Sequence, residues 1–510
     1  MKLSGRHYQA FIICCLTLIQ AHLFLYGYRL SADDVAFHLY GLGGWDSAWG
    51  WVISDAMQQG RITHLISLPT NIFGSYYADH VFFRIIYTAL YFVNFILIGY
   101  WAALHCLQRP HKDFIFLFIL VLLSLHPLDF FHLPPNAYPL QISIPVTLIL
   151  ASRIAIWHLS KNSNGPFSGG AIASRSLFFF GLMFGEYSFL FGLSLITSEY
   201  LIRWSRSYEA SGGVRASTFG LSKDRGFWLD SAVIVGFLAL YFGFRYAFPS
   251  NYPGNQLASD FNAWLFFKTL FGHVLGGTSV MSFFRDPSRV LVYLNETEAK
   301  IFVITGLLFF STFFVAKKIL GNIVHEIAPK NSGYYYLILC GLLIAFTVTT
   351  PIALSGKYQG WCNDFRSCIF IDSRISFPGL GLICIGVLGA ISGHIKIRPF
   401  NIVVTLSFAI AVASCLTYLN NLTAAKEMEI YSSPWITAQQ LSCGSPKRLS
   451  SDHLASAIDP KGLLMVHPNF PSDHYWRNYL IHWEKHCGIA DKQTIDKRKS
   501  GSSETIYFKE

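Results

Sequence analysis

The residues best suited to chemistry begin with an acidic pair, Asp33 and Asp34, a few residues beyond the first long apolar stretch. A carboxylate held in a cleft above a membrane can take a proton from a hydroxyl group and act as a general base. Two neighbouring carboxylates in a solvated loop need no such role, because water stabilises both charges. The pair therefore indicates either a catalytic base or a wetted loop, and its surroundings must decide.

A second group of polar residues lies between positions 351 and 376 and carries cations. Lys357 and Arg374 are expected at the level of the outer lipid headgroups, with Tyr358 beside them. Cations at this depth suit a lipid phosphate, although long basic side chains also reach the interface without any ligand. Arg285 is a weaker candidate of the same kind.

Four further residues are candidates for contacts with a substrate. Arg61 follows a Trp-rich amphipathic segment, and His80 precedes the second long apolar stretch. Glu186 and Tyr187 stand at the expected turn between two short apolar segments. An acidic group near a membrane is a functional hypothesis by default, but a solvated turn would also tolerate it.

The composition indicates which kind of scaffold must position these residues. The chain has 510 residues, of which 52% are apolar and only 13% charged, and its formal net charge is +10. Soluble domains carry about 25% charged residues, and disordered chains combine low hydrophobicity with high charge. The sequence therefore predicts an all-α polytopic membrane protein. The positive charge is concentrated in the loops that set orientation, so no nucleic-acid partner is expected.

About eleven segments are predicted to be transmembrane helices, the first of them an uncleaved anchor: 8–28, 82–105, 114–126, 139–159, 176–185, 187–202, 227–247, 299–316, 334–354, 375–393 and 400–419. Lys and Arg, with Arg153 and Arg175 counted among them, are enriched in alternate short loops, which predicts a cytoplasmic N-terminus. This assignment requires 176–202 to cross twice, as two half-length helices meeting near Gly185. Residues 1–419 then form the membrane domain, and 420–510 form a small extracytoplasmic α+β cap.

The long outer loops are aromatic and partly amphipathic, which favours helices lying in the membrane interface, as around Trp45 and Trp49. Simple packing would explain these helices equally well. The polar segment 126–138 is predicted to be structural, because Pro134 and Pro135 already account for a sharp turn there.

Four of the ten cysteines fall on the predicted outer side, where disulfides are stable: Cys362, Cys368, Cys443 and Cys487. The local pairings are Cys362–Cys368 and Cys443–Cys487, although four cysteines allow three connectivities and unpaired thiols are the alternative. No C-x-x-C pair occurs, so zinc is not expected. A divalent metal would fit beside two carboxylates, but no further ligand cluster supports it, and no cofactor is predicted.

These features in this order resemble the GT-C superfamily of integral-membrane glycosyltransferases. The superfamily includes protein O-mannosyltransferases, aminoarabinose transferases of lipid A and bacterial O-antigen-modifying glucosyltransferases. The resemblance covers residues 1–105 well, and 176–200 and 350–376 more loosely. Besides the cytoplasmic N-terminus, the matching motifs are Asp33-Asp34, an interfacial helix ending in Gly60-Arg61, Phe83-Arg84 at the start of the second span, Glu186-Tyr187, and the stretch Leu354-Ser355-Gly356-Lys357-Tyr358-Gln359.

The resemblance implies a reaction at the extracytoplasmic face. A sugar would pass from a polyprenyl-phosphate donor to an acceptor hydroxyl of an envelope glycan, lipid or protein, with inversion at the anomeric carbon. Asp33, or in second place Asp34, would be the general base, and Lys357 and Arg374 would bind the donor phosphate. The short loops favour a bacterial inner membrane. Neither the sugar nor the acceptor follows from the sequence.

Other functions compatible with such a chain are a transporter or flippase of lipid-linked saccharides, a polymerase or ligase of such saccharides, and a non-catalytic scaffold. Transporters favour discontinuous helices and binding sites near the middle of the membrane. Here 176–202 is one interrupted segment without an evident twin, and the ionisable residues gather at the outer ends of the helices. The sequence therefore favours an enzyme.

Overall fold

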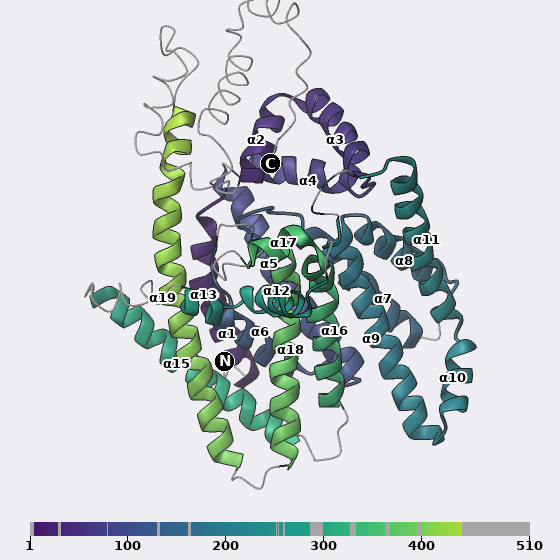
Figure 1. The fold of residues 1–510 in the computed structure, drawn as a ribbon. Helices are drawn as coiled ribbons and strands as arrows, with labels where there is room; N and C mark the ends of the chain where they lie inside the picture. The colour runs from purple at the N-terminus through teal and green to yellow at the C-terminus, as the bar shows by residue number, and fades with distance from the viewer. Residues whose placement is uncertain are drawn as a thin grey trace, which may run out of the picture.

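The computed structural model describes residues 5–28, 32–78, 80–129, 133–161, 165–250, 252, 254, 256–258, 261–285, 299–326, 333–362, 368–394 and 399–440 (Figure 1). Within these ranges the regular elements are helices, and the one β-type contact is an isolated bridge between Leu257 and Ser355. The expectation of an all-α membrane protein is therefore confirmed for the described part of the chain.

Eight helical segments in the described part are long and apolar enough to cross a membrane, judged by length and composition. They are α1 (Gly5–Ala21) with the 3-10 turn η1 (His22–Leu25), α5 (Val81–Cys106), α7 (Ser143–Lys161), α11 (Arg225–Ala247), α15 (Ala299–Glu326), α16 (Gly333–Leu354), α18 (Ile371–His394) and α19 (Pro399–Gln440). A bilayer core of about 30 Å needs about 20 apolar residues in a helix, and these segments supply them.

The other three predicted spans are also helical, as α6 (Lys112–Leu125), α8 (Gly169–Leu182) and α9 (Glu186–Ser211). The break between α8 and α9 falls beside Gly185, as expected. The expectation of two half-length helices is wrong for α9, which has 26 residues. The helix is longer because it continues through polar residues such as Arg203 and Arg206. A search for apolar runs stops before these residues.

Two polar contacts, one at the start of α9 and one near its middle, show that it runs antiparallel to α11. At the start of α9, Glu186 accepts a hydrogen bond of 2.7 Å from the Tyr241 hydroxyl near the end of α11. Further along α9, the Tyr200 hydroxyl donates to Asp230 near the start of α11, at 2.9 Å. These two contacts define two ends of the bundle, one near Glu186 and one near Asp230.

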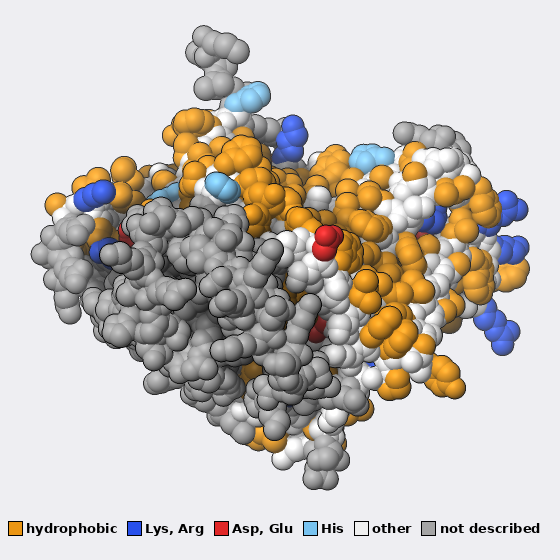
Figure 2. All heavy atoms as spheres, turned by 90° about the horizontal axis from the view of Figure 1, so that it is seen from above, with side chains coloured by type: hydrophobic (Ala, Val, Ile, Leu, Met, Phe, Trp, Pro, Cys, Tyr) orange, Lys and Arg blue, Asp and Glu red, His pale blue; other side chains and the backbone are white. Residues whose placement is uncertain are grey.

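The first long loop forms three short helices, α2 (Ala32–Leu42), α3 (Trp45–Gln59) and α4 (His64–Tyr77). They lie together at one end of the bundle, at the top of Figure 1. One face of α3 is buried through Ala48, Val52 and Ala56. The opposite face carries Trp45, Trp49, Ile53 and Met57, spaced four residues apart and 43–45% exposed. Seen from above, hydrophobic side chains dominate the described surface (Figure 2).

The remaining helices are short connectors: α10 (Val214–Ser222), α12 (Ala263–Gly276), α13 (Ser279–Arg285) and α17 (Gly356–Trp361). The domain boundary expected after residue 419 falls inside α19, which continues to Gln440. The α+β cap expected at 420–510 lies mostly outside the described residues, and so do Cys443 and Cys487. The α+β cap and the Cys443–Cys487 disulfide therefore stay predictions.

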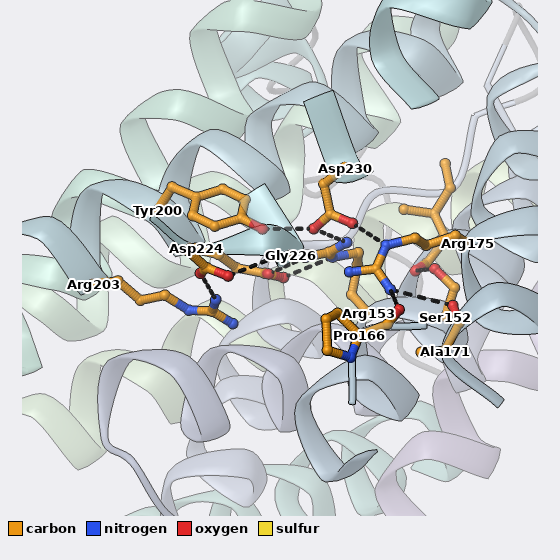
Figure 3. A network of polar contacts seen from close by, with 12 residues as sticks. Ser152, Arg153, Pro166, Ala171, Arg175, Tyr200, Arg203, Asp224, Gly226 and Asp230 are labelled. Atoms are coloured by element: carbon orange, nitrogen blue, oxygen red, sulfur yellow. Dashed lines mark hydrogen bonds and ion pairs between the residues drawn. The ribbon is translucent and has the colours of Figure 1, made fainter. Parts of the chain in front are cut away.

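Charged residues of α7, α8, α9 and α11 form a buried network (Figure 3). Arg153 pairs with Glu199 and, at 2.8 Å, with Asp230, which also pairs with Arg175 at 2.8 Å. The sequence-based orientation counted Arg153 and Arg175 as loop cations. Both residues lie inside helices, Arg153 in α7 and Arg175 in α8, where carboxylates on α9 and α11 neutralise them. They therefore bear less directly on orientation than expected.

Candidate functional site

The two carboxylates of the acidic pair lie in the first turn of α2 but have different surroundings. Asp34 is fully buried, and its Oδ1 accepts hydrogen bonds from the Ser75 hydroxyl at 3.1 Å and from the Tyr138 backbone N–H at 3.0 Å. Asp33 is half-buried and accepts a hydrogen bond from the Tyr138 hydroxyl. Asp33 is therefore the carboxylate that a substrate can reach more easily.

Tyr138 joins both carboxylates and has an unusual backbone. Its φ angle is +50°, in the left-handed region that bulky residues rarely adopt. A residue with a Cβ adopts this conformation at a cost of about 1–2 kcal/mol, which the hydrogen bond to buried Asp34 helps to offset. Burial, and then the nearby Asp33 carboxylate, hold the pKa of the Tyr138 phenol well above its usual value. The hydroxyl therefore remains a hydrogen-bond donor.

Arg61 is positioned by the end of α3. Gly60 ends that helix with φ +61°, and a Cβ at this position would lie 2.3 Å from the Phe248 carbonyl oxygen, so only glycine fits. The next residue, Arg61, places its Nε 3.0 Å from Glu186 Oε1. Burial is the largest single effect on Arg61 and lowers its pKa, but the Glu186 carboxylate and the nearby tyrosine hydroxyls together raise that pKa above its usual value.

Lys357 lies on α17 and shares an aromatic partner with Arg61. Its Nζ donates a hydrogen bond of 2.9 Å to the Tyr252 hydroxyl and lies 4.7 Å from the centre of that ring. The Arg61 guanidinium lies 5.5 Å from the same ring centre. Neighbouring Tyr358 is buried, and burial, with Tyr252 as the next cause, holds the pKa of its phenol well above the usual value.

One aromatic ring connects the acidic and cationic residues. The Phe370 ring centre lies 6.4 Å from that of Tyr138, 6.2 Å from that of Tyr187 and 5.3 Å from that of Tyr358. Residues far apart in the sequence therefore form one group, which we call the acid–cation cluster: Asp33, Arg61, Tyr138, Glu186, Tyr187, Tyr252, Lys357 and Tyr358. It combines two half-buried carboxylates with two cations and several phenols.

Arg374 has a different environment from Lys357. It is only 2% exposed, and its guanidinium donates to the backbone carbonyls of Pro127, Pro134 and Gly277. A phosphate would have to replace these bonds in a closed interior. The geometry therefore favours a structural role, in which Arg374 ties the segment before Tyr138 to the end of α12.

His80 and Arg285 are the two remaining candidates from the sequence. His80 is exposed at the start of α5, with its ring centre 6.3 Å from that of Phe83. Arg285 ends α13, and its side chain lies outside the described residues.

The predicted disulfide between Cys362 and Cys368 is confirmed, with 4.7 Å between the Cα atoms. It links the end of α17 to the segment before α18, beside buried His273, whose Nδ1 lies 3.0 Å from Asp372 Oδ1. His273 and the two cysteines are the one group of potential metal ligands found among the described residues. Both sulfurs are used in the disulfide, so they do not offer thiolates to a metal.

Sequence reasoning missed Tyr252, Ser75 and the role of Tyr138. No spacing rule brings Tyr252 to Lys357, since 105 positions separate them. For Tyr138, the adjacent acidic pair on α2 was the missing partner, and only the fold reveals it. Comparison with protein-family models, with curated proteins and with solved structures gives no match. The geometry of the acid–cation cluster is therefore the basis for assigning a function.

Proposed function

We propose that this chain is an integral-membrane glycosyltransferase. In this proposal it moves a sugar from a polyprenyl-phosphate donor to an acceptor hydroxyl at the extracytoplasmic face, with inversion. The observation that carries it is the acid–cation cluster, in which Asp33 lies within one aromatic group with Lys357 and Arg61. A base and cations that are joined through neighbouring aromatic side chains suit such a transfer.

The chemistry assigns a role to each part of the cluster. A phosphate is a good leaving group, so cations that neutralise it are sufficient and a general acid is dispensable. Lys357 binds the donor phosphate, and Arg61, oriented by Glu186, supports it. Asp33 takes the proton from the acceptor hydroxyl as that oxygen attacks the anomeric carbon, which breaks its bond to the phosphate oxygen. The phenols of Tyr187 and Tyr358 suit contacts with sugar hydroxyls.

The same proposal includes an arrangement in the membrane. With α6, α8 and α9 added to the eight long apolar segments, the chain would cross the membrane eleven times. A cytoplasmic N-terminus would then put the cluster outside. The segment after α19 would then be extracytoplasmic, where Cys443 and Cys487 would form a second disulfide. The exposed face of α3 suits the membrane interface. A bacterial inner membrane, with an envelope glycan, lipid or protein as acceptor, agrees with this arrangement.

Mass spectrometry of envelope glycans from cells with and without the gene tests the function. We expect a glycan, lipid or protein that carries one hexose or pentose more when the gene is present. Unchanged envelope glycans, with the protein present in the membrane, would contradict the proposal.

A transporter of lipid-linked saccharides is the second candidate, because of the buried network around Arg153. Ionisable residues inside a helix bundle often mark ion or substrate pathways. Here Arg153, Glu199 and Asp230 neutralise one another through direct ion pairs, which equally suits a structural role. Accumulation of the lipid-linked sugar on the cytoplasmic side in cells without the gene would favour transport.

A further inference from the structure

Asp33 and Asp34 are neighbours in the sequence, yet only Asp33 is exposed enough to meet a substrate. Asp34 lies behind it, and one oxygen of its carboxylate already accepts hydrogen bonds from α4 and from the segment before α7. A carboxylate in that position is well placed to hold other residues and poorly placed to take a proton from an acceptor.

We propose that Asp34 and Tyr138 act together as positioning residues for Asp33. Asp34 holds the Tyr138 backbone through its N–H, and Tyr138 holds the Asp33 carboxylate through its hydroxyl. This inference rests on the proposed function only for its effect on rate, since the arrangement itself can be tested without any activity.

The backbone of Tyr138 shows why an anchor is required. At φ +50° the residue is in a conformation that a tyrosine leaves when nothing holds it. Its buried N–H has Asp34 Oδ1 as acceptor at 3.0 Å, and a buried N–H without an acceptor is costly. Loss of that acceptor should let the segment relax, which carries the Tyr138 hydroxyl away from Asp33.

Ser75 gives the anchor a second attachment. Its hydroxyl donates to the same Asp34 oxygen at 3.1 Å, so α2, α4 and the Tyr138 segment meet at one atom. The carbonyl oxygen of an asparagine side chain can accept both hydrogen bonds in the same way. An anchor therefore requires only an acceptor oxygen at position 34, whereas a general base requires a carboxylate.

This difference separates the two roles by substitution. Asp34→Asn should keep most of the transfer rate, while Asp34→Ala should lower it about 10-fold to 100-fold through misplacement of the base. Tyr138→Phe removes the hydroxyl and should lower the rate about 10-fold with little change in donor binding. Asp33→Asn should lower the rate about 10²–10⁴-fold, because the proton acceptor itself is lost.

Hydrogen–deuterium exchange of the purified full-length protein in detergent tests the anchor without activity. We expect the amide hydrogens of residues 133–142 to exchange faster in Asp34→Ala than in the wild type, and Asp34→Asn to stay protected. Ser75→Ala is the matched control, since it removes a donor to Asp34 and leaves the Tyr138 N–H bond in place. Equal protection in Asp34→Ala and the wild type would overturn the inference.

The rate measurement uses cells lacking the gene that express each variant, with the gene-dependent mass increment on envelope glycans as the readout. Donor binding is measured on the purified variants with undecaprenyl monophosphate as the probe. An Asp34→Asn variant as inactive as Asp33→Asn would overturn the inference, and so would a fully active Tyr138→Phe variant. Absence of any gene-dependent increment would contradict the proposed function alone, because the exchange measurement still decides on the anchor. If Asp34→Ala fails to fold, Asp34→Asn and Tyr138→Phe decide in its place.

Discussion

The acid–cation cluster and the buried network around Arg153 contain the same residue types but differ in exposure. In the network, the side chains of Arg153 and Glu199 are 0% and 1% exposed. In the cluster, the side chains of Arg61 and Glu186 are 21% and 31% exposed, and Lys357 is half-buried against Tyr252. Closed ion pairs hold helices together, whereas partly open ones can exchange partners with a ligand. Exposure therefore separates a structural charge cluster from a candidate site.

The two regions should lie on opposite sides of the membrane, which is an all-or-none expectation. Single cysteines at Ser47, near the start of α3, and at Ser211, at the far end of α9, report the two sides. A membrane-impermeant thiol reagent added to intact cells should label Ser47→Cys and leave Ser211→Cys unlabelled. Labelling of both positions, or of Ser211→Cys alone, would contradict the proposed orientation. Parallel labelling of opened membranes is the control, because both exposed positions should then react.

Removing Glu199 should destabilise the whole protein, because Glu199 belongs to the buried network around Arg153. Glu199→Ala leaves Arg153 without its partner on α9 and removes the acceptor of the Trp101 Nε1–H at 2.8 Å. Breaking a buried ion pair costs about 3–5 kcal/mol, so we expect a lower unfolding temperature in detergent and less protein in the membrane.

The matched control for this change is Arg203→Ala, which breaks a pair with Asp224 in which the side chains are 38% and 35% exposed. Exposed pairs contribute about 0–1 kcal/mol, so the unfolding temperature should hardly change. Equal effects of the two substitutions would remove the distinction between closed and open charge clusters.

Lys357→Ala should weaken donor binding without unfolding the protein. A hydrogen bond to a charged group contributes about 1.5–3 kcal/mol, so we expect the affinity for undecaprenyl monophosphate to fall at least about 10-fold. Lys357→Arg keeps the charge and should retain part of the affinity. Lys161→Ala is the control, because Lys161 also lies over an aromatic ring, 4.2 Å from the centre of Trp157, but away from the cluster. Unchanged affinity in Lys357→Ala would exclude it as a phosphate ligand.

Apolar runs predicted the helices well, because a segment long enough to span a bilayer has a composition that no soluble segment needs. The Cys362–Cys368 disulfide was also predictable, since the two cysteines are only six positions apart in a loop that the sequence assigns to the outer side. Arg374 shows where the sequence stops being informative. Its basic character suggested a phosphate ligand, yet backbone carbonyls bind it, and backbone positions follow only from the folded chain.

The acidic pair shows the same limit on a smaller scale. The sequence named both Asp33 and Asp34 as candidates for the base, with Asp33 first, because adjacent residues of one type have nearly the same local signal. Their different partners, Ser75 and Tyr138, lie 41 and 104 positions from Asp34 and are brought there by α4 and by the segment before α7. Long-range packing, which no local pattern encodes, separates their roles.

The most direct test of the glycosyltransferase proposal compares wild type with Asp33→Asn in cells that otherwise lack the gene. Mass spectrometry gives the fraction of envelope glycan that carries the gene-dependent sugar, at equal amounts of folded protein in the membrane. We predict that the wild type restores this sugar and that Asp33→Asn reduces the initial rate of its addition about 10²–10⁴-fold. Full modification by the Asp33→Asn/Asp34→Asn double variant would contradict the assignment of a carboxylate base to this pair.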